Sequence, residues 1–576
     1  MKNYNRYIIF IFLFLFAASC NEEEFLEEIP LDFYAPENSF VTFEQFESAI
    51  YNLHASVRNE LWGNRGFTEF PRIGWYGTDL VRSRSDTEQS LNYEVSWGPL
   101  GNTLGIWELG YRIIFDANVI IGRSDDEISE LTADQKTLIE AEARFFRAYM
   151  YNILANLYGG VPIVLEEIKT PRRNFVRASR QEVYAQCADD LKFAVEKLPG
   201  IDEASEARIN NLAASHVLTE VYISLERWQD AITEASKVID HPSTALMTER
   251  FGNKYTDVEN FGWYKEGEFD LDNYGDVYND LFVPGNQDRS IGNTESIWVL
   301  QYEYLVDGGG DRNYQLERFV CPRLSRSAVI QSDGSTSPIL AEPNTYYCGR
   351  GQGFLKPSPY FLQELWVKSG FDQDIRNSKH NIIRDIKVNN PANEYHGQWV
   401  VEDNVPLRQV TNDDTTRVFY PILAKVTTPG MHPPEFWSPN QSIPGTLLRS
   451  AERTWRKHYM IRLAETYLLR AEAYLGAGQL EEAAEDINVV RSRANAPDVL
   501  PSEVDIDYIL DERLRELHYE TLRIVTLARL GKIVDRNRRL NPVVAATMKD
   551  HQNLWAIPFS EINKNVEAKL EQNTGY

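Results

Sequence analysis

Aromatic and polar side chains are interleaved between residues 62 and 107, and this mixture has the chemistry of a sugar-binding site. Sugar rings present apolar C–H faces that pack on flat aromatic rings, and their hydroxyls need amide or charged partners. Loops that carry both kinds of group meet this requirement. The candidate ligand-binding residues of this segment are Trp75, Tyr76, Asp79, Arg82, Trp97 and Asn102.

The same aromatic residues could also fill a core. Trp62 and Trp107 lie in helical patterns and are expected in the core. Trp75 and Trp97 lie in aperiodic stretches, so both the core and the ligand remain open for them. Residues 243–455 add a second set of aromatic candidates, which consists of Tyr302, Tyr304, Tyr314, Tyr346, Tyr347, Trp399 and Trp437.

Catalytic motifs are missing from the sequence. It contains no GxSxG, HExxH or Walker loop, and its nine histidines are scattered. The 85 acidic residues are too many to single out a glycosidase pair. Asp270–Asp276 loosely resembles a calcium loop, but Tyr274 stands where Asp or Asn is needed and Leu281 replaces the terminal Glu. We therefore expect an acidic turn there, and predict no enzyme activity, cofactor or metal site.

Net charge and cysteine spacing exclude further classes of function. The formal net charge of −26 disfavours nucleic acid as a partner, because phosphate backbones are repelled. The four cysteines form no CxxC or Cys/His cluster. Cys187 lies in a helical pattern and is expected to be buried, whereas Cys321 and Cys348 flank a loop and could pair in an oxidising compartment.

The first twenty residues predict export and a lipid anchor. Lys2 and Arg6 precede an apolar run at residues 8–16 that is too short to span a bilayer, and small residues lead to Cys20. The sequence thus predicts a lipoprotein signal peptide over residues 1–19, with Cys20 as the lipidated N-terminus. A plain signal peptide is the alternative. Residues 20–40 then form a tether, and its glutamates resemble surface-export signals of some Gram-negative lipoproteins.

The sequence predicts helical repeats of the tetratricopeptide kind, which would form the scaffold that positions the loops. Such repeats place a small residue early in the second helix, so that it approaches the first helix closely. Three separate segments of the chain follow this repeat pattern. Their key positions are Cys187, Leu191, Ala194 and Pro199 in the first, Tyr222, Ala231, Ala235 and Pro242 in the second, and Tyr474, Ala483, Ile487 and Pro497 in the third. Generic amphipathic helix pairs are the alternative interpretation. Thr42 and Gln45 predict a capping box at the start of the first helix, and another helix is expected over residues 107–121.

The predicted fold is mainly α, a tetratricopeptide-like helical repeat scaffold with a large loop-rich insertion lobe and few short strands. Residues 41–242 form an N-terminal helical scaffold that includes a ligand loop at about 62–106. Residues 243–455 are the loop-rich insertion, in which Ser296–Tyr304 alternates like a strand. Residues 456–576 carry the last repeat.

Several segments together resemble the SusD/RagB family of nutrient-binding outer-membrane lipoproteins. "EARFFRAYMYNILANLYGGVPIV" is similar to the family's long helix, and "HYMIRLAETYLLRAEAYLGAGQLEEAAEDINVVRSRA" to its most recognisable segment. "ILDERLRELHYETLRIVTLARLG" and the C-terminal "LWAIPFSEINKNVEAKLEQNTGY" also fit. The resemblance runs over nearly the whole chain.

The resemblance implies a function and a location. The protein would be a lipid-anchored, exterior-facing protein of the cell outer membrane that captures oligosaccharides or polysaccharides and delivers them to a SusC-like TonB-dependent transporter. Family members place binding residues in loops that correspond here to Arg82, Trp97 and Asn102, and to Tyr304 and Tyr314. Some members bind peptides or glycopeptides, so a peptide-binding importer lipoprotein is the alternative.

Overall fold

The computed structural model describes residues 39–63, 74–83, 93, 97–101, 103–310, 315–408 and 417–576. Three predicted site residues, Cys20, Asn102 and Tyr314, lie outside the described residues, as does the predicted signal peptide. Among the described helices, none combines the length and apolar character needed to cross a membrane.

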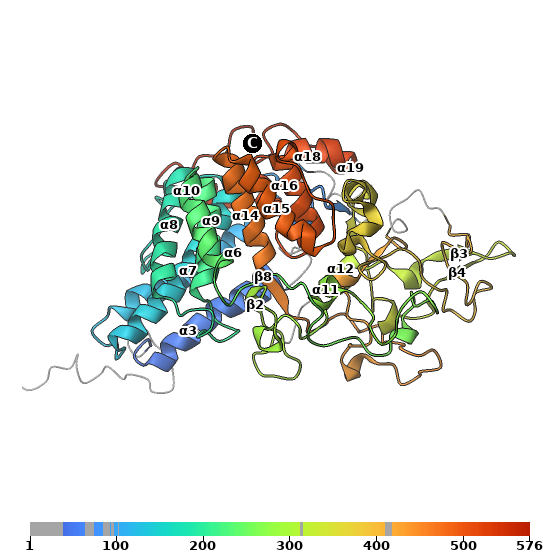
Figure 1. Ribbon diagram of the computed structural model, residues 1–576. Helices are drawn as coiled ribbons and strands as arrows, with labels where there is room; N and C mark the ends of the chain where they lie inside the picture. The colour runs from blue at the N-terminus through green and yellow to red at the C-terminus, as the bar shows by residue number, and fades with distance from the viewer. Residues whose placement is uncertain are drawn as a thin grey trace, which may run out of the picture.

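A helical scaffold occupies one side of the molecule (Figure 1). Its first helix, α3, begins after the predicted capping box of Thr42 and Gln45, which is confirmed. The N-terminal scaffold helices are α3 (Phe43–Ser56), α6 (Thr103–Ser124), α7 (Ala133–Tyr158), α8 (Arg180–Lys197), α9 (Asn211–Ser224) and α10 (Trp228–Ile239). The C-terminal ones are α14 (Leu463–Gly476), α15 (Leu480–Arg493), α16 (Ile506–Leu517), α17 (Arg523–Arg529), α18 (Ile533–Leu540), α19 (Pro542–Ala545) and α20 (Phe559–Lys564).

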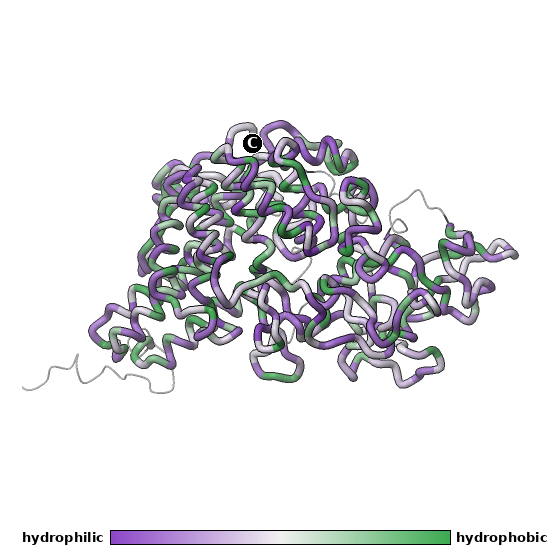
Figure 2. The backbone as a smooth tube through the Cα atoms, viewed as in Figure 1, coloured by the Kyte–Doolittle hydropathy of each residue, from purple (hydrophilic) through white to green (hydrophobic). Residues whose placement is uncertain are grey.

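Small and apolar residues at the predicted repeat positions lie between packed helices. Ala231 and Ala235 on α10, and Ala483 and Ile487 on α15, are completely buried. Hydrophilic and hydrophobic residues alternate along these helices, as amphipathic packing requires (Figure 2). The predicted fold class, a mainly α tetratricopeptide-like scaffold with a loop-rich lobe, is confirmed.

The repeats stack although the chain leaves the scaffold between them. Helix α10 packs against α14, which follows more than 200 residues later in the sequence. Gly476 lies so close to the Trp228 ring that a Cβ there would come within 2.5 Å of it. In addition, Arg470 Nη1 donates to Ser236 Oγ at 2.9 Å. The chain thus returns to the same stack after the insertion.

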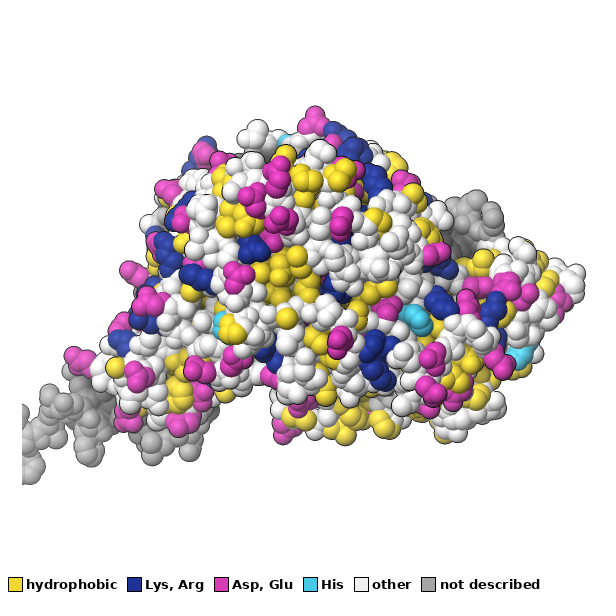
Figure 3. Space-filling view, in the orientation of Figure 1, with side chains coloured by type: hydrophobic (Ala, Val, Ile, Leu, Met, Phe, Trp, Pro, Cys, Tyr) yellow, Lys and Arg dark blue, Asp and Glu magenta, His cyan; other side chains and the backbone are white. Residues whose placement is uncertain are grey.

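The loop-rich lobe occupies the other side of the molecule, next to the scaffold (Figure 1). Its helices are short, and they are α11 (Val277–Asp280), α12 (Leu316–Val320) and α13 (Leu365–Val367). Every described sheet is an antiparallel pair, namely β1 (Val81–Ser83) with β5 (Leu355–Pro357), β2 (Ser296–Leu300) with β8 (His458–Arg462), β3 (Ala328–Ile330) with β4 (Thr336–Pro338), and β6 (Ile382–Ile383) with β7 (Ile422–Leu423). Acidic side chains are spread over the visible face of both parts rather than gathered in one patch (Figure 3).

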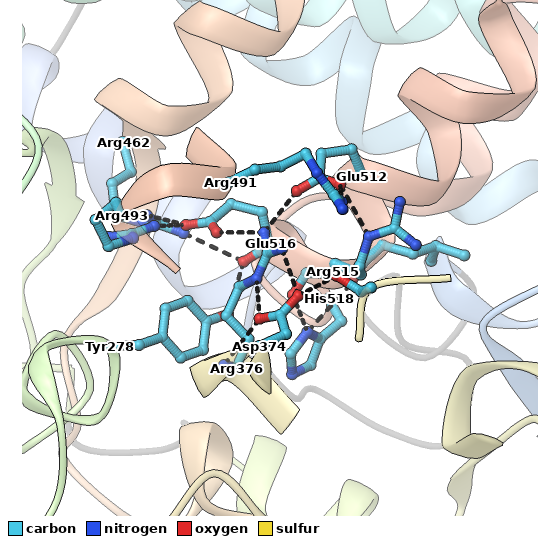
Figure 4. Close-up of polar contacts among 12 residues, drawn as sticks. Tyr278, Asp374, Arg376, Arg462, Arg491, Arg493, Glu512, Arg515, Glu516 and His518 are labelled. Atoms are coloured by element: carbon cyan, nitrogen blue, oxygen red, sulfur yellow. Dashed lines mark hydrogen bonds and ion pairs between the residues drawn. The ribbon is translucent and has the colours of Figure 1, made fainter. Parts of the chain in front are cut away.

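A buried ionic network joins the scaffold to the lobe (Figure 4). Glu516 of α16 accepts from Arg462 Nη1 at 2.8 Å and from Arg376 Nη1 at 3.0 Å. Glu512, one turn earlier, accepts from the same Arg376 nitrogen at 2.7 Å. Arg376 belongs to the lobe, where Asp374 also holds it. These side chains are 0–1 % exposed, so each charge depends on its partners for solvation.

The network keeps its carboxylates ionised in spite of burial. Burial alone would raise the pKa of Glu512, but the charges of Arg376, Arg515 and Arg491 outweigh it and hold that pKa well below its usual range. The pKa of Glu516 is likewise lowered by its arginine neighbours. The junction between the two parts is therefore held by paired buried charges.

Candidate ligand-binding site

Trp75 and Tyr76, which were candidates for ligand contact, lie in the core. Trp75 is completely buried, and its Nε1 donates to the backbone oxygen of Thr521 at 2.7 Å. Tyr76 is 7 % exposed, and its hydroxyl donates to the carbonyl of Phe354 at 2.9 Å. Both side chains therefore pack the first segment against distant parts of the chain, where no surface ligand reaches them.

Trp97 and Asp79 are buried as well, so a structural role replaces the expected ligand contact. The Trp97 ring stacks on Trp555, with ring centroids 4.9 Å apart and planes 6° apart. Asp79 accepts from Arg523 Nε at 2.9 Å and from Arg536 Nε at 2.6 Å. Burial would raise the pKa of Asp79, but the two guanidinium charges outweigh it and lower that pKa below its usual range.

Arg82 is the one described residue of the first candidate set that is not fully buried. It lies in β1, where its Cα pairs with that of Lys356 in β5, and its side chain is half-buried. It stays a prediction as a ligand contact. The expected core positions of Trp62 and Trp107 agree with their exposures of 6 % and 4 %.

Tyr304 lies on the surface of the lobe, beside two side chains that are distant in sequence. Its ring meets the ring of Trp455 edge to face, with centroids 4.9 Å apart and planes at 71°. Its hydroxyl donates to a carboxylate oxygen of Glu435. We call Tyr304, Glu435 and Trp455 the aromatic platform.

The β2–β8 pair brings the platform together. Leu300 of β2 pairs with His458 of β8, so the chain that leaves β2 and the chain that enters β8 lie at the same end of the pair. Tyr304 follows β2 and Trp455 precedes β8. The two rings are neighbours for this reason, although 150 residues of chain separate them.

Contacts with neighbouring residues fix the positions of both aromatic rings of the platform. The Trp455 ring lies nearly parallel to that of the buried Phe436, with centroids 6.1 Å apart. The loop that carries Tyr304 closes where Glu303 N donates to Gly309 O at 2.8 Å. Arg58 of the scaffold donates to the carbonyl of Gly308 at 2.7 Å and holds the loop in place.

The platform faces solvent and has a polar edge. The next residue after Tyr304, Leu305, is 86 % exposed, and Glu435 is exposed too. Glu452, three residues before Trp455, receives hydrogen bonds from Arg318 and Arg350. The hydrogen bond to Glu435 is the main cause that raises the pKa of Tyr304, so the phenol stays protonated at neutral pH. Aromatic faces, carboxylates and a phenol hydroxyl are thus available side by side.

The other aromatic candidates of the lobe differ in exposure. Tyr302, Tyr346 and Tyr347 are buried. Trp437 is half-buried and donates from Nε1 to the carbonyl of His432 at 2.9 Å. Trp399 is also half-buried, and Lys387 lies over its ring at 5.0 Å.

Sequence reasoning missed Trp455 and Glu435. Trp455 is the last residue of the predicted loop-rich insertion, three residues before the segment that resembles the family's repeat helices, and it is not among the aromatic candidates of that insertion. The available signal was the strand pattern after it, which would have placed Trp455 beside whatever leaves the partner strand. No sequence signal pointed to Glu435, because it lies in an aperiodic loop.

An apolar pocket of about 410 Å³ lies on the scaffold, away from the platform. Trp107, Tyr111, Phe115 and Phe175 are among its lining residues. Two of its polar groups bind the protein itself, since the Tyr111 hydroxyl donates to the carbonyl of Pro162 at 2.8 Å and Asn118 Nδ2 to that of Val164 at 2.9 Å. The charged side chains of Glu108, Arg172, Glu561 and Lys564 also line the pocket. We place the glycan at the platform instead, because Tyr304 is one of the residues that the family resemblance indicates.

Metal-binding geometry does not occur in the part of the chain that the structure describes, which holds no group of three His, Cys, Asp or Glu side chains placed around an ion. In the segment that loosely resembles a calcium loop, Asp276 caps α11 and accepts from Asn279 N at 2.8 Å. Asn381 Nδ2 also donates to both of its carboxylate oxygens.

Two family models match most of the chain. The model described as "SusD family" matches residues 294–576. A second, described as "Starch-binding associating with outer membrane", matches residues 31–223. The two matches cover the C-terminal half and the N-terminal scaffold, and they fall on the segments that carry the resemblance.

Curated relatives extend the match over nearly the full length. "SusD-like protein P25" of Formosa agariphila is 24% identical over 561 residues, which cover 92% of this chain and 90% of that protein. A "SusD-like protein" of Bacteroides ovatus is 26% identical over 250 residues, 41% of this chain and 44% of that protein.

Solved structures share the fold. A "Laminarin binding SusD-like protein" superposes with a TM-score of 0.64 at 21% identity and covers 93% of this chain and 100% of that one. "Surface glycan-binding protein A from Bacteroides thetaiotaomicron in complex with laminarihexaose" has a TM-score of 0.63 at 17% identity, over 92% of this chain and 100% of that one. The family matches, the relatives and the common fold together place this chain in the SusD/RagB family.

Proposed function

We propose that the protein captures oligosaccharides at the cell surface and delivers them to a SusC-like TonB-dependent transporter. The half-buried Tyr304–Trp455 pair with the exposed Glu435 beside it is the observation that carries this proposal. The rings offer faces for the C–H side of a sugar, and the carboxylate accepts hydrogen bonds from its hydroxyls. We place the ligand lobe at residues 243–455, with the platform at its junction to the scaffold.

The shape of the site favours a chain of sugars over a single enclosed one. The platform is an open surface rather than a cavity, so a polysaccharide can lie across it. Laminarin is the first glycan to test, since a related structure is named for binding it. Related structures are named for binding glycans, so the proposed role is binding without catalysis.

Attachment to the membrane would place the binder beside its transporter. In our proposal the signal peptide is removed at Cys20, the cysteine carries the lipid, and the protein faces the exterior. Tethering raises the effective concentration of a captured glycan at the pore. The scaffold would meet the transporter and leave the lobe free for the ligand.

Affinity electrophoresis with isothermal titration calorimetry tests the binding role. The protein without residues 1–20 is run in native gels that contain laminarin, starch, xylan or pectin, and is titrated with oligosaccharides of the retarding polymer. We expect one polymer to retard it, and Trp455→Ala to abolish the retardation. Trp399→Ala is the matched control, because it removes another half-buried tryptophan of the lobe and leaves the platform intact.

Other outcomes would redirect the proposal. Retardation that survives Trp455→Ala together with Tyr304→Ala would rule out the platform as the site. Release of reducing sugar by the pure protein would contradict the binding-only role. A peptide that co-purifies and is identified by mass spectrometry, without retardation by any polymer, would favour the peptide- or glycopeptide-binding alternative.

A further inference from the structure

Two buried thiols lie close together inside the lobe. Cys321 follows α12 and Cys348 follows the short 3-10 turn of Thr345–Tyr347. Each is 1 % exposed and a free thiol in the structure, and each lies close enough to the other to affect its pKa. The third described cysteine, Cys187, is buried in the scaffold on α8.

The backbone alone holds these two positions together. The segment after Cys348 runs beside α12, where Gln352 N donates to Arg318 O at 2.7 Å and Gly353 N donates to Cys321 O at 2.8 Å. Gly351 lies so close that a Cβ there would come within 2.7 Å of the Cys321 carbonyl oxygen. The approach of the thiols is thus set by main-chain pairing and by tight glycine packing.

We propose that Cys321 and Cys348 form a disulfide bond in the exported protein. The inference rests on the export that the proposed function includes. Both S–H bonds break and one Sγ–Sγ bond forms, while two protons and two electrons pass to the disulfide of an extracytoplasmic thiol–disulfide oxidoreductase, which becomes a dithiol. The intermediate is a mixed disulfide between one of the two cysteines and that enzyme.

The bond forms while the lobe is still folding. Burial raises the pKa of both thiols, so few thiolates exist once the lobe has packed. The oxidoreductase must therefore meet the first cysteine in an open chain, and the second cysteine then resolves the mixed disulfide as the main-chain pairing forms. Once closed, the bond is shielded from reductants by the same burial.

The cross-link supports the ligand site. It ties α12 to the segment that carries Arg350, and both elements hold Glu452, since Arg318 and Arg350 donate to this carboxylate. Glu452 lies three residues before Trp455 in the platform. A closed disulfide therefore fixes the wall behind the platform, and we expect its loss to weaken glycan binding severalfold and to lower the Tm by a few degrees.

Differential alkylation of the mature protein from the cell envelope tests the bond. The protein is denatured with N-ethylmaleimide, digested without reduction and analysed by mass spectrometry. We expect Cys187 to be alkylated, and one peptide pair to be linked through Cys321 and Cys348. Alkylation of both lobe cysteines before reduction would overturn the inference.

Thermal unfolding supplies a second readout. Dithiothreitol, present during unfolding, should lower the Tm of the wild-type and Cys187→Ser proteins. The Tm of Cys321→Ser, of Cys348→Ser and of the variant with both substitutions should already be low, and dithiothreitol should not lower it further. An equal Tm with and without reductant in the wild type would again contradict the bond. An unlinked pair in a protein that still binds glycan overturns this inference alone, whereas a linked pair in a protein that binds no glycan overturns the proposed function alone.

Discussion

Two aromatic pairs in this protein have the same ring separation and opposite surroundings. Trp97 and Trp555 stack with centroids 4.9 Å apart, and Tyr304 and Trp455 meet edge to face at the same distance. The first pair is fully buried, whereas Tyr304 and Trp455 are half-buried, and Leu305, next to Tyr304 in the chain, is 86 % exposed. Ring contact alone therefore does not separate a core from a binding surface.

Two carboxylates, one in the first candidate segment and one in the platform, differ in the same way. Asp79 is buried, and its carboxylate accepts hydrogen bonds from the guanidinium groups of Arg523 and Arg536, which balance its charge. Glu435 is exposed, and the structure gives it one neutral partner, the hydroxyl of Tyr304. A carboxylate held by buried guanidinium groups stabilises the fold, while one on the surface can exchange its partner for a sugar hydroxyl.

The largest expected effect comes from breaking the buried charge cluster. Asp79→Ala leaves Arg523 and Arg536 short of a buried counter-charge, which costs about 3–5 kcal/mol of unfolding free energy. Urea unfolding followed by tryptophan fluorescence measures this loss. Glycan affinity per folded molecule should stay unchanged, and a large loss of affinity in the folded fraction would return Asp79 to the ligand site.

Trp97→Ala should cost almost as much stability. Removing the ring leaves a cavity against Trp555, and substitutions of this kind cost about 3–5 kcal/mol. The destabilisation should be smaller for Trp97→Phe, which keeps one aromatic ring in the stack. Native gels run well below the unfolding temperature should still show retardation by the glycan; loss of binding with unchanged stability would place Trp97 on the surface.

Trp455→Ala should have the opposite effect, with a large loss of glycan affinity and a small loss of stability. The loss of one stacking face should weaken glycan binding by roughly 10- to 100-fold, or about 1.4–2.8 kcal/mol. The unfolding free energy should fall by less than half of the Trp97→Ala value, because the ring is only half-buried. Calorimetric titration and urea unfolding of the same sample compare the two effects. Equal loss of stability in both variants would abolish the distinction between core and platform.

The sequence predicts the scaffold well because helix packing has a local signature. Small residues such as Ala231 and Ala483 recur at fixed positions, and each lies buried between helices. The strand at Ser296 was also predictable from its alternation, and the structure places it at β2 (Ser296–Leu300). These features depend on neighbours within one repeat or one strand.

The ligand site was less predictable because exposure depends on distant partners. Trp97 is buried by Trp555, and Trp75 by the chain around Thr521, both of which come hundreds of residues later. Trp455 joins Tyr304 only because β8 pairs with β2. No local pattern near Trp97 or Trp455 carries this information, so composition pointed to the buried aromatic cluster as readily as to the exposed one.

Acid titration should test whether Asp79 is the buried, arginine-paired carboxylate of this comparison. The pKa of Asp79 is lower in the folded protein than its usual 3.8, so protonation favours the unfolded chain. Its stabilisation is complete above about pH 5 and is lost as the pH falls through 3.8 toward the folded pKa. Asp79→Asn should therefore flatten the slope of unfolding free energy against pH below about pH 4, by at most about 1.4 kcal/mol per pH unit. A slope that is the same in Asp79→Asn and in the wild type would contradict the assignment.

The smallest effect should come from the hydroxyl of Tyr304. Tyr304→Phe keeps the ring beside Trp455 and removes only the hydrogen bond to Glu435, so binding should weaken by about two- to threefold. Because Glu435 raises the pKa of the phenol above 10, wild-type affinity should stay flat from pH 6 to about pH 9. Calorimetric titrations across this range check both points, with Tyr302→Phe as a control on a buried neighbour. If Tyr304→Phe cost as much affinity as Trp455→Ala, the hydroxyl rather than the aromatic face would be the main contact, and the platform would bind its ligand through polar groups.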